Sequence, residues 1–68
     1  GTRNARYLER WGVGSLEALA RSDPEALVAC FGSTPADVRP AQVRVWWRAA
    51  RRRAGADAEP GSLRLACG

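Results

Sequence analysis

The stretch that decides the fold is LERWGVGSLEALARSDPEALVACFG, residues 8–32, because it contains two strong turn signals. The first is a GVG sequence, in which glycine permits the positive φ of a tight turn and the following Ser15 can cap a new helix. The second is an SDPE sequence, in which Asp23 can cap, proline suits the first helical position, and glutamate faces the positive end of the helix dipole. The stretch therefore predicts a helix end, a tight hairpin and two further helices, the second of which ends at Gly32.

Two more helices and one short helical turn are predicted outside this stretch. On the N-terminal side, Thr2 or Asn4 can cap a first helix. On the C-terminal side, the STPAD sequence at residues 33–37 repeats the capping pattern but leaves room for a single helical turn, because Pro40 excludes the helical conformation from the residue before it. Pro40 also begins the last helix, which we expect to run to Ala54 and to end at Gly55.

The predicted fold class is all-α. Residues 1–55 are expected to form a single helical domain, a compact bundle of four short helices with one helical turn, and no segment shows the alternation typical of a strand. Residues 56–68, ADAEPGSLRLACG, carry proline, glycine and small residues without a helical or alternating pattern. We therefore expect these residues to form a flexible C-terminal tail.

The composition argues against catalysis and against a bound metal or cofactor. The chain of 68 residues has no histidine, only two cysteines, and seven acidic residues that are scattered along it. A domain of this size also has a thin core and little room for a cleft lined by several elements. We therefore expect a protein that is not an enzyme and that has no cofactor and no metal site.

Cysteine number and hydropathy bear on the compartment. Two cysteines, Cys30 and Cys67, do not make a disulfide framework, and whether they pair is left open by the sequence. No apolar run approaches the roughly 18 to 20 residues of a membrane span, and the polar N-terminal stretch lacks a signal-peptide pattern. We expect an intracellular protein without a membrane partner, nuclear if the source is eukaryotic and cytoplasmic if it is bacterial.

Positive charge is concentrated in one segment of the chain. There are eleven arginines, no lysine and seven acidic residues, which gives a net charge of +4. Six of the arginines and no acid lie in residues 39–53, so this segment carries +6, while five arginines against seven acids leave −2 elsewhere. A concentrated basic segment on a small domain suits a phosphate backbone or an acidic protein surface.

Within this segment, the sequence QVRVWWRAARRR, residues 42–53, separates apolar from basic side chains at the helical period of about 100° per residue. The apolar stripe consists of Val43, Trp46, Trp47, Ala50 and Ala54. The basic face consists of Arg44, Arg48, Arg51 and Arg52, and Arg53 falls on the other flank. We interpret the tryptophans as core residues. The basic face is favourable against phosphate, because no acid on this helix relieves the repulsion between its charges.

Residues 8–32 resemble helix-hairpin-helix domains, in which an apolar helix end is followed by G-h-G, a short helix and a helix that begins with a DPEEL-like sequence. In that family the hairpin amides hold a nucleic-acid phosphate, and the same hairpin occurs as a plain structural turn in related SAM-like interaction domains. The resemblance implies a phosphate site at Gly12, Val13, Gly14 and Ser15, by the physics of a helix N-terminus. The chain departs from the pattern after Gly32, where STPADVRP replaces a second glycine hairpin.

The segment QVRVWWRAARRR also resembles the third helix of a homeodomain, where Q-V-x-V-W-[FW] precedes an arginine-rich end. This resemblance implies that Arg48 and Arg52 face bases and that Arg51 and Arg53 contact phosphates. Ala49 departs from the pattern, because homeodomains have an adenine-reading asparagine there.

Three classes of function remain open from the sequence, of which the least favoured is a purely structural accessory domain of a larger enzyme. The first is a small non-catalytic domain that binds nucleic acid, with double-stranded DNA as the favoured ligand. Its expected contacts are Arg44, Arg48, Arg51, Arg52, Arg53, Gly12, Gly14 and Ser15. The second is a SAM-like module that binds a protein partner with an acidic surface. An atypical homeodomain transcription factor is a further alternative within the nucleic-acid class.

Overall fold

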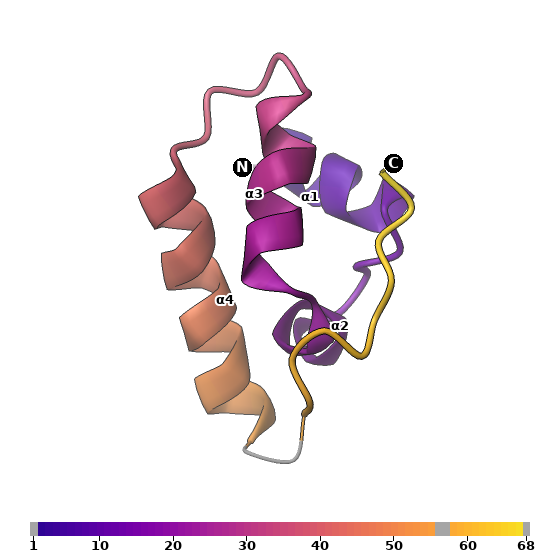
Figure 1. Ribbon diagram of the computed structural model, residues 1–68, viewed down its shortest axis with the longest axis vertical. Coiled ribbons are helices and arrows are strands. Elements are labelled where there is room, and N and C mark those ends of the chain that lie inside the picture. The colour runs from indigo at the N-terminus through magenta and orange to yellow at the C-terminus, as the bar shows by residue number, and fades with distance from the viewer. Residues whose placement is uncertain (1, 56–57, 68) are drawn as a thin grey trace.

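All four predicted helices form, in the order that the sequence indicates (Figure 1). The structure is a computed structural model that describes residues 2–55 and 58–67, and in these ranges it contains helices and loops but no strand. The helices are α1 (Thr2–Arg10), α2 (Leu16–Arg21), α3 (Pro24–Gly32) and α4 (Pro40–Ala54). The prediction of an all-α chain with four helices is confirmed for the described residues.

The two predicted caps at the starts of α2 and α3 are confirmed. Ser15 Oγ accepts a hydrogen bond from the Ala18 amide at 3.1 Å, which satisfies one of the unpaired donors in the first turn of α2. Asp23 Oδ1 accepts a hydrogen bond from the Glu25 amide at 3.3 Å, and proline occupies the first turn of α3. Local sequence therefore explains where each of these helices begins.

Glycine ends two of the other segments as predicted. Gly12, in the turn two residues beyond the end of α1, and Gly55, directly after α4, have φ values of 89° and 88°, a conformation that L side chains rarely adopt. The start of α1 differs in one respect from the expectation. The helix already begins at Thr2, so Asn4 lies inside it and does not act as its cap.

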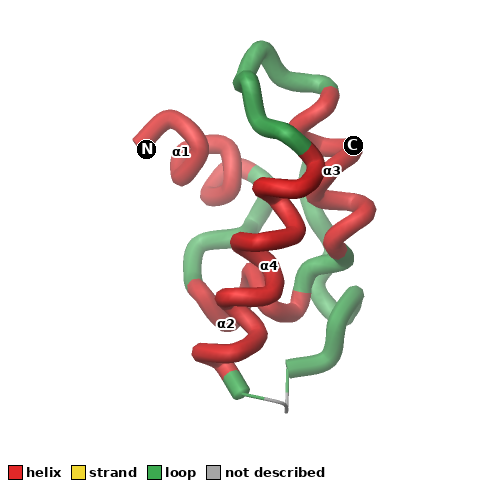
Figure 2. The backbone as a smooth tube through the Cα atoms, turned by 90° about the vertical axis from the view of Figure 1, so that its left-hand side faces the viewer, coloured by secondary structure: helices red, strands yellow, loops and turns green. Residues whose placement is uncertain are grey.

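The core lies between the helices and is built around aromatic rings. Trp11 packs edge-on against Phe31 with ring centroids 4.7 Å apart, and Trp46 of α4 approaches the same phenyl ring at 5.9 Å. The buried members of this cluster are Trp11, Val13, Leu27, Cys30, Phe31 and Val43. α4 packs along α2 and α3, an arrangement that can be followed in Figures 1 and 2. The hairpin residue Val13 and the α4 residue Val43 thus belong to one core.

The helical turn predicted after α3 does not form, and residues 33–39 are a turn and bends followed by irregular backbone. The hydroxyls of Ser33 and Thr34 each donate a hydrogen bond of 2.8 Å to a carbonyl in the last turn of α3. Thr34 Oγ1 also accepts a hydrogen bond of 3.2 Å from the Ala36 amide. These side-chain bonds compete with helix formation, and Arg39 is extended because proline follows it.

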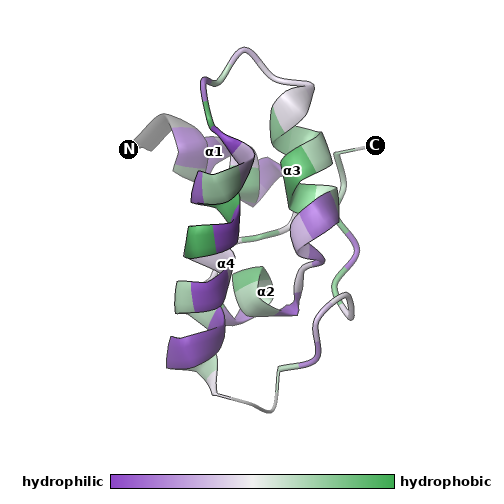
Figure 3. Cartoon of the chain, turned by 60° about the vertical axis from the view of Figure 1, so that its left-hand side comes forward, coloured by the Kyte–Doolittle hydropathy of each residue, from purple (hydrophilic) through white to green (hydrophobic). Residues whose placement is uncertain are grey.

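Residues 58–67, which we name the C-terminal strap, pack against the helices and do not form the flexible tail that the sequence predicts. In Figures 1 and 3 the strap and α4 lie on opposite sides of α3. The amide of Leu63 donates to the Arg21 carbonyl at 3.1 Å, and the amide of Ala66 donates to the Trp11 carbonyl at 3.0 Å. The tail prediction is therefore wrong for the strap, while residues 56, 57 and 68 lie outside the described residues.

A disulfide between Cys30 of α3 and Cys67 closes the strap onto the bundle. The two Cα atoms lie 5.8 Å apart although the residues are separated by 37 positions in the sequence. Leu63 and Leu65, which precede Cys67, pack partly buried against the core. The pairing that the composition leaves open is therefore settled by tertiary contact. In this half of the strap burial alternates, because Leu63, Leu65 and Cys67 are partly buried while Ser62, Arg64 and Ala66 are exposed.

Candidate nucleic-acid interface

The side of α4 that faces the core, its inner face, consists of Val43, Trp46, Trp47, Ala50 and Ala54. Val43 and Ala50 are buried, and both tryptophans are partly buried against the core. The indole Nε1 of Trp47 donates a hydrogen bond of 2.7 Å to the Ser22 carbonyl, which ties α4 to the end of α2. The interpretation of the tryptophans as core residues is therefore confirmed, and neither ring is positioned as an open stacking platform.

The opposite side of α4, its outer face, consists of Val45, Arg48, Ala49 and Arg52, and all four residues are exposed. Val45 is 56% exposed. Figure 3 shows hydrophilic stretches that recur along α4 toward its C-terminal end. Arg53 is also exposed, but it lies on the flank of the helix next to the inner face. The outer face therefore presents two guanidinium groups, one helical turn apart, beside small and apolar side chains.

Arg44 and Arg51 lie at the border between the two faces and are engaged within the protein. Arg44 Nη2 forms an ion pair of 3.1 Å with Glu25 Oε1 on α3. Arg51 Nη1 donates a hydrogen bond of 2.6 Å to the carbonyl of Ala58 in the strap, and its guanidinium lies 5.2 Å from the centre of the Trp47 ring. The predicted face of four arginines is therefore divided into two exposed and two partnered residues.

The arginines of α4 differ in what their positive charges interact with. The last turn contains Arg51, Arg52 and Arg53, whose charges interact favourably with the negative end of the helix dipole. In the described ranges, the Arg44–Glu25 contact is the one ion pair, and no described hydrogen bond engages the side chain of Arg48 or Arg52. Part of the arginine cluster thus stabilises α4 itself, whereas the side chains of Arg48 and Arg52 are exposed.

The Gly-Val-Gly hairpin lies on the other side of α4. Val13 is buried in the core, and its amide donates a hydrogen bond of 2.7 Å to the Leu8 carbonyl. The Gly12 amide donates to the Glu9 carbonyl at 3.1 Å, so two of the four expected phosphate-binding amides are used inside the hairpin. Gly14 and Ser15 are exposed. Val13 packs in the same core as the inner face of α4, whereas Arg48 and Arg52 lie on the outer face. The predicted nucleic-acid contacts of the hairpin and of α4 are therefore two separate surfaces.

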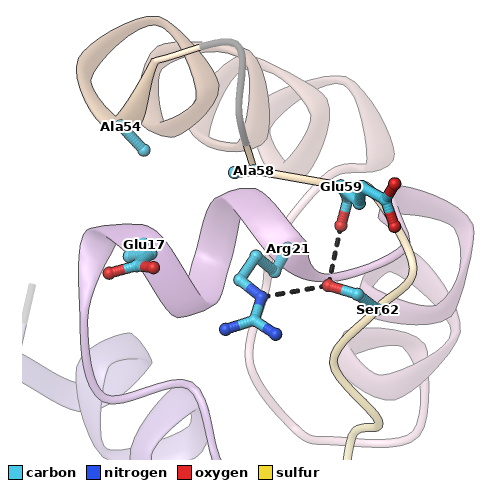
Figure 4. A pocket seen from close by; sticks show the side chains of 6 residues that line it. All are labelled: Glu17, Arg21, Ala54, Ala58, Glu59 and Ser62. Carbon is cyan, nitrogen blue, oxygen red and sulfur yellow. Dashed lines mark hydrogen bonds between the residues drawn. The ribbon is translucent and has the colours of Figure 1, made fainter.

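A polar cavity of about 330 Å³ lies where the ends of α2 and α4 meet the strap, and sequence reasoning did not point to it (Figure 4). Its lining residues are Glu17, Arg21, Ala54, Ala58, Glu59 and Ser62. Arg21 Nε donates a hydrogen bond of 3.0 Å to Ser62 Oγ, and that hydroxyl donates to the Glu59 carbonyl at 2.9 Å. The only sequence signal for this cavity is the mixture of charges in α2 and the strap, which become neighbours through the fold.

No protein-family model, curated protein or solved structure matches this chain. In the described part of the chain, no group of three or more histidine, cysteine, aspartate or glutamate side chains could hold a metal ion. The described helices also include none with the length and apolar character needed to cross a membrane.

Proposed function

We propose that this protein is a small non-catalytic domain that binds nucleic acid, most favourably double-stranded DNA, through the outer face of α4. The observation that carries the proposal is the exposure of Arg48 and Arg52 on a helix that contains no acidic residue. A ligand that carries phosphates would neutralise both charges and release its condensed counterions. Arg53 on the flank, with Arg44 and Arg51 at the border, would add to the positive potential around the contact.

The shape of the outer face fits a helix that lies in a groove. Val45 and Ala49 are small enough to let the helix backbone approach a ligand closely, and the helix runs for 15 residues without interruption. An α-helix fits the major groove of DNA, where arginine is suited to bidentate contacts with guanine. Since Ala49 offers no hydrogen-bonding group, we expect binding dominated by backbone charge with limited reading of sequence.

The resemblances place this proposal in relation to known folds. A helix-hairpin-helix or SAM-like arrangement agrees with the order of α1, the hairpin and α2, and would give Gly14 and Ser15 a secondary role at a phosphate. The homeodomain resemblance agrees with the use of α4 as the docking helix. Unlike an extended N-terminal arm, α1 is helical from Thr2 onward. The proposal rests on α4 because the Gly12 and Val13 amides already have partners.

A protein-interaction module is the second candidate, and the exposure of Val45 favours it. An apolar side chain flanked by Arg48 and Arg52 would suit the edge of an acidic protein surface. We expect this alternative to show itself as binding that does not require nucleic acid.

The salt dependence of duplex binding tests the proposal. In the double variant Arg48→Gln/Arg52→Gln, the slope of log K against log salt is expected to fall in magnitude by about 1.8, since each phosphate contact contributes about 0.9. The matched control is Arg6→Gln/Arg10→Gln on α1, which removes the same charge from two exposed positions. An unchanged slope in the α4 variant, or an equal loss in both variants, would overturn the role of the outer face.

The hairpin alternative is tested in the same assay with Gly14→Val. Gly14 has no positive φ and no atom within 4 Å of an added Cβ, so the substitution should leave the fold intact. We expect nearly unchanged binding. Loss of binding in this variant, together with normal binding by the α4 variant, would assign the site to the hairpin.

A further inference from the structure

The strap is held to the bundle at its two ends by different kinds of contact. At its beginning, Ala58 is buried beside Ala20 of α2 and Ala50 of α4. At its end, Cys67 is joined covalently to Cys30. The strap therefore spans the bundle from the C-terminal end of α4 to the last turn of α3.

Between these ends, few interactions hold the strap in place. The described contacts include two backbone hydrogen bonds, made by the amides of Leu63 and Ala66, and the side-chain bond between Arg21 and Ser62. The leucine side chains of the strap are only partly buried. A segment with this little burial opens readily unless a covalent bond keeps its ends close to their partners. The disulfide is thus the main restraint on the C-terminal half of the strap.

The strap also engages basic side chains of two helices. Its Ala58 carbonyl accepts the 2.6 Å hydrogen bond from Arg51, the border residue next to the outer face of α4. Its Ser62 hydroxyl accepts the bond from Arg21 at the end of α2 (Figure 4). Glu59 of the strap lines the same cavity as Arg21 and brings a negative charge to this end of the molecule. The strap is one of several partners of Arg51, which also donates to the Ala20 carbonyl at 3.5 Å and lies over the Trp47 ring.

We infer that the Cys30–Cys67 disulfide is a redox-controlled latch, whose reduction releases the C-terminal half of the strap, residues 63–67, from the bundle.

The chemistry of release is a thiol–disulfide exchange with a small thiol or a dithiol reductant. The reductant thiolate attacks Sγ of Cys67, which is partly exposed, whereas Cys30 is only 4% exposed. Cys30 leaves as a thiolate and takes up a proton. A second reductant thiol then resolves the mixed disulfide, so two electrons and two protons pass to the cysteines and the reductant becomes a disulfide. In a reducing intracellular compartment the released form is the expected one, whereas an oxidising environment favours the latched form.

Hydrogen exchange tests the release of the strap without any ligand. On reduction with dithiothreitol, the amides of Leu63 and Ala66 are expected to lose at least about tenfold more protection than the amide of Leu27 in α3. The variant Cys67→Ser should show the same exchange pattern and should no longer respond to the reductant. Unchanged relative protection of the strap amides, in either the reduced protein or the variant, would overturn the latch.

Discussion

The inner and outer faces of α4 belong to the same 15-residue helix, yet one packs against the core and the other faces solvent. The inner face buries Val43 and Ala50 and anchors Trp47 to the Ser22 carbonyl. The outer face leaves Val45 and Arg48 in solvent. A run of charge in the sequence is therefore a poor unit of function, because the helical period distributes its members around the axis.

Four arginines of α4 differ from one another in whether their side chains have a partner. Arg44 and Arg51 have an acidic side chain and a backbone carbonyl as partners, and these partners come from α3 and the strap. Arg48 and Arg52 are one helical turn apart and have no such partner among the described residues. What separates the two pairs is the position of neighbouring segments, since the four side chains are chemically identical.

The sharpest test of the two faces compares adjacent alanines. Ala50 is 0% exposed between Ala20 and Ala58, so Ala50→Leu should overpack this contact. We expect a loss of about 1 to 3 kcal/mol in the free energy of unfolding. Thermal unfolding should show the loss as a fall of roughly 4 to 8 °C per kcal/mol.

Ala49→Leu is the matched control, because Ala49 is exposed on the outer face. Its effect on stability should stay within about 0.5 kcal/mol. Equal destabilisation by the two substitutions would mean that the outer face is packed, and the distinction between the faces would fail.

A second test compares the two tryptophans of the inner face. Trp47→Phe removes the indole donor from the Ser22 carbonyl, whereas Trp46→Phe removes ring area alone, since no described hydrogen bond involves the Trp46 indole. We expect Trp47→Phe to cost about 1 kcal/mol more than Trp46→Phe. Urea unfolding of both variants measures this difference. A smaller cost for Trp47→Phe would show that the bond to Ser22 does not anchor α4.

The smallest expected effect concerns the ion pair at the border of the faces. The side chains of Arg44 and Glu25 are 43% and 68% exposed, so water and salt screen their attraction. Glu25→Gln should change the free energy of unfolding by no more than about 0.5 kcal/mol. The variant should also steepen the salt slope of duplex binding, because the Glu25 carboxylate no longer competes with a phosphate for Arg44.

Glu9→Gln on α1 provides the control for the change in overall charge, because Glu9 is exposed and makes no ion pair in the described ranges. The same increase in slope for both variants would show that net charge, and not the release of Arg44, sets the affinity.

The success of sequence reasoning in this protein follows the range of the interactions involved. Ser15 and Asp23 cap helices through bonds to amides two or three residues away, so their roles are visible in short motifs. The helical period likewise identified the inner face of α4. The helical turn expected at residues 33–37 does not form, because Thr34 accepts a hydrogen bond from the Ala36 amide without starting a helix. The sequence motif is compatible with either structure.

Longer-range features were not predictable in this way. The strap at residues 58–67 has partners that lie far away in the sequence, so no local motif shows where it packs. A helical wheel places Arg51 on the exposed basic face, but in the structure its guanidinium donates a hydrogen bond to the Ala58 carbonyl. The Val13 amide donates a hydrogen bond within the hairpin, so it does not contribute to the phosphate site that the G-h-G motif suggested.

Helix positions, caps and the division of α4 into two faces follow from the chain itself, because they depend on backbone geometry and neighbours within one or two turns. The Cys30–Cys67 disulfide, the closure of the strap and the choice of which arginines remain exposed depend on the packed bundle. Each of these requires segments that are distant in sequence to meet in space. Their position is set by burial of the shared core around Phe31 and not by any local preference of the residues concerned.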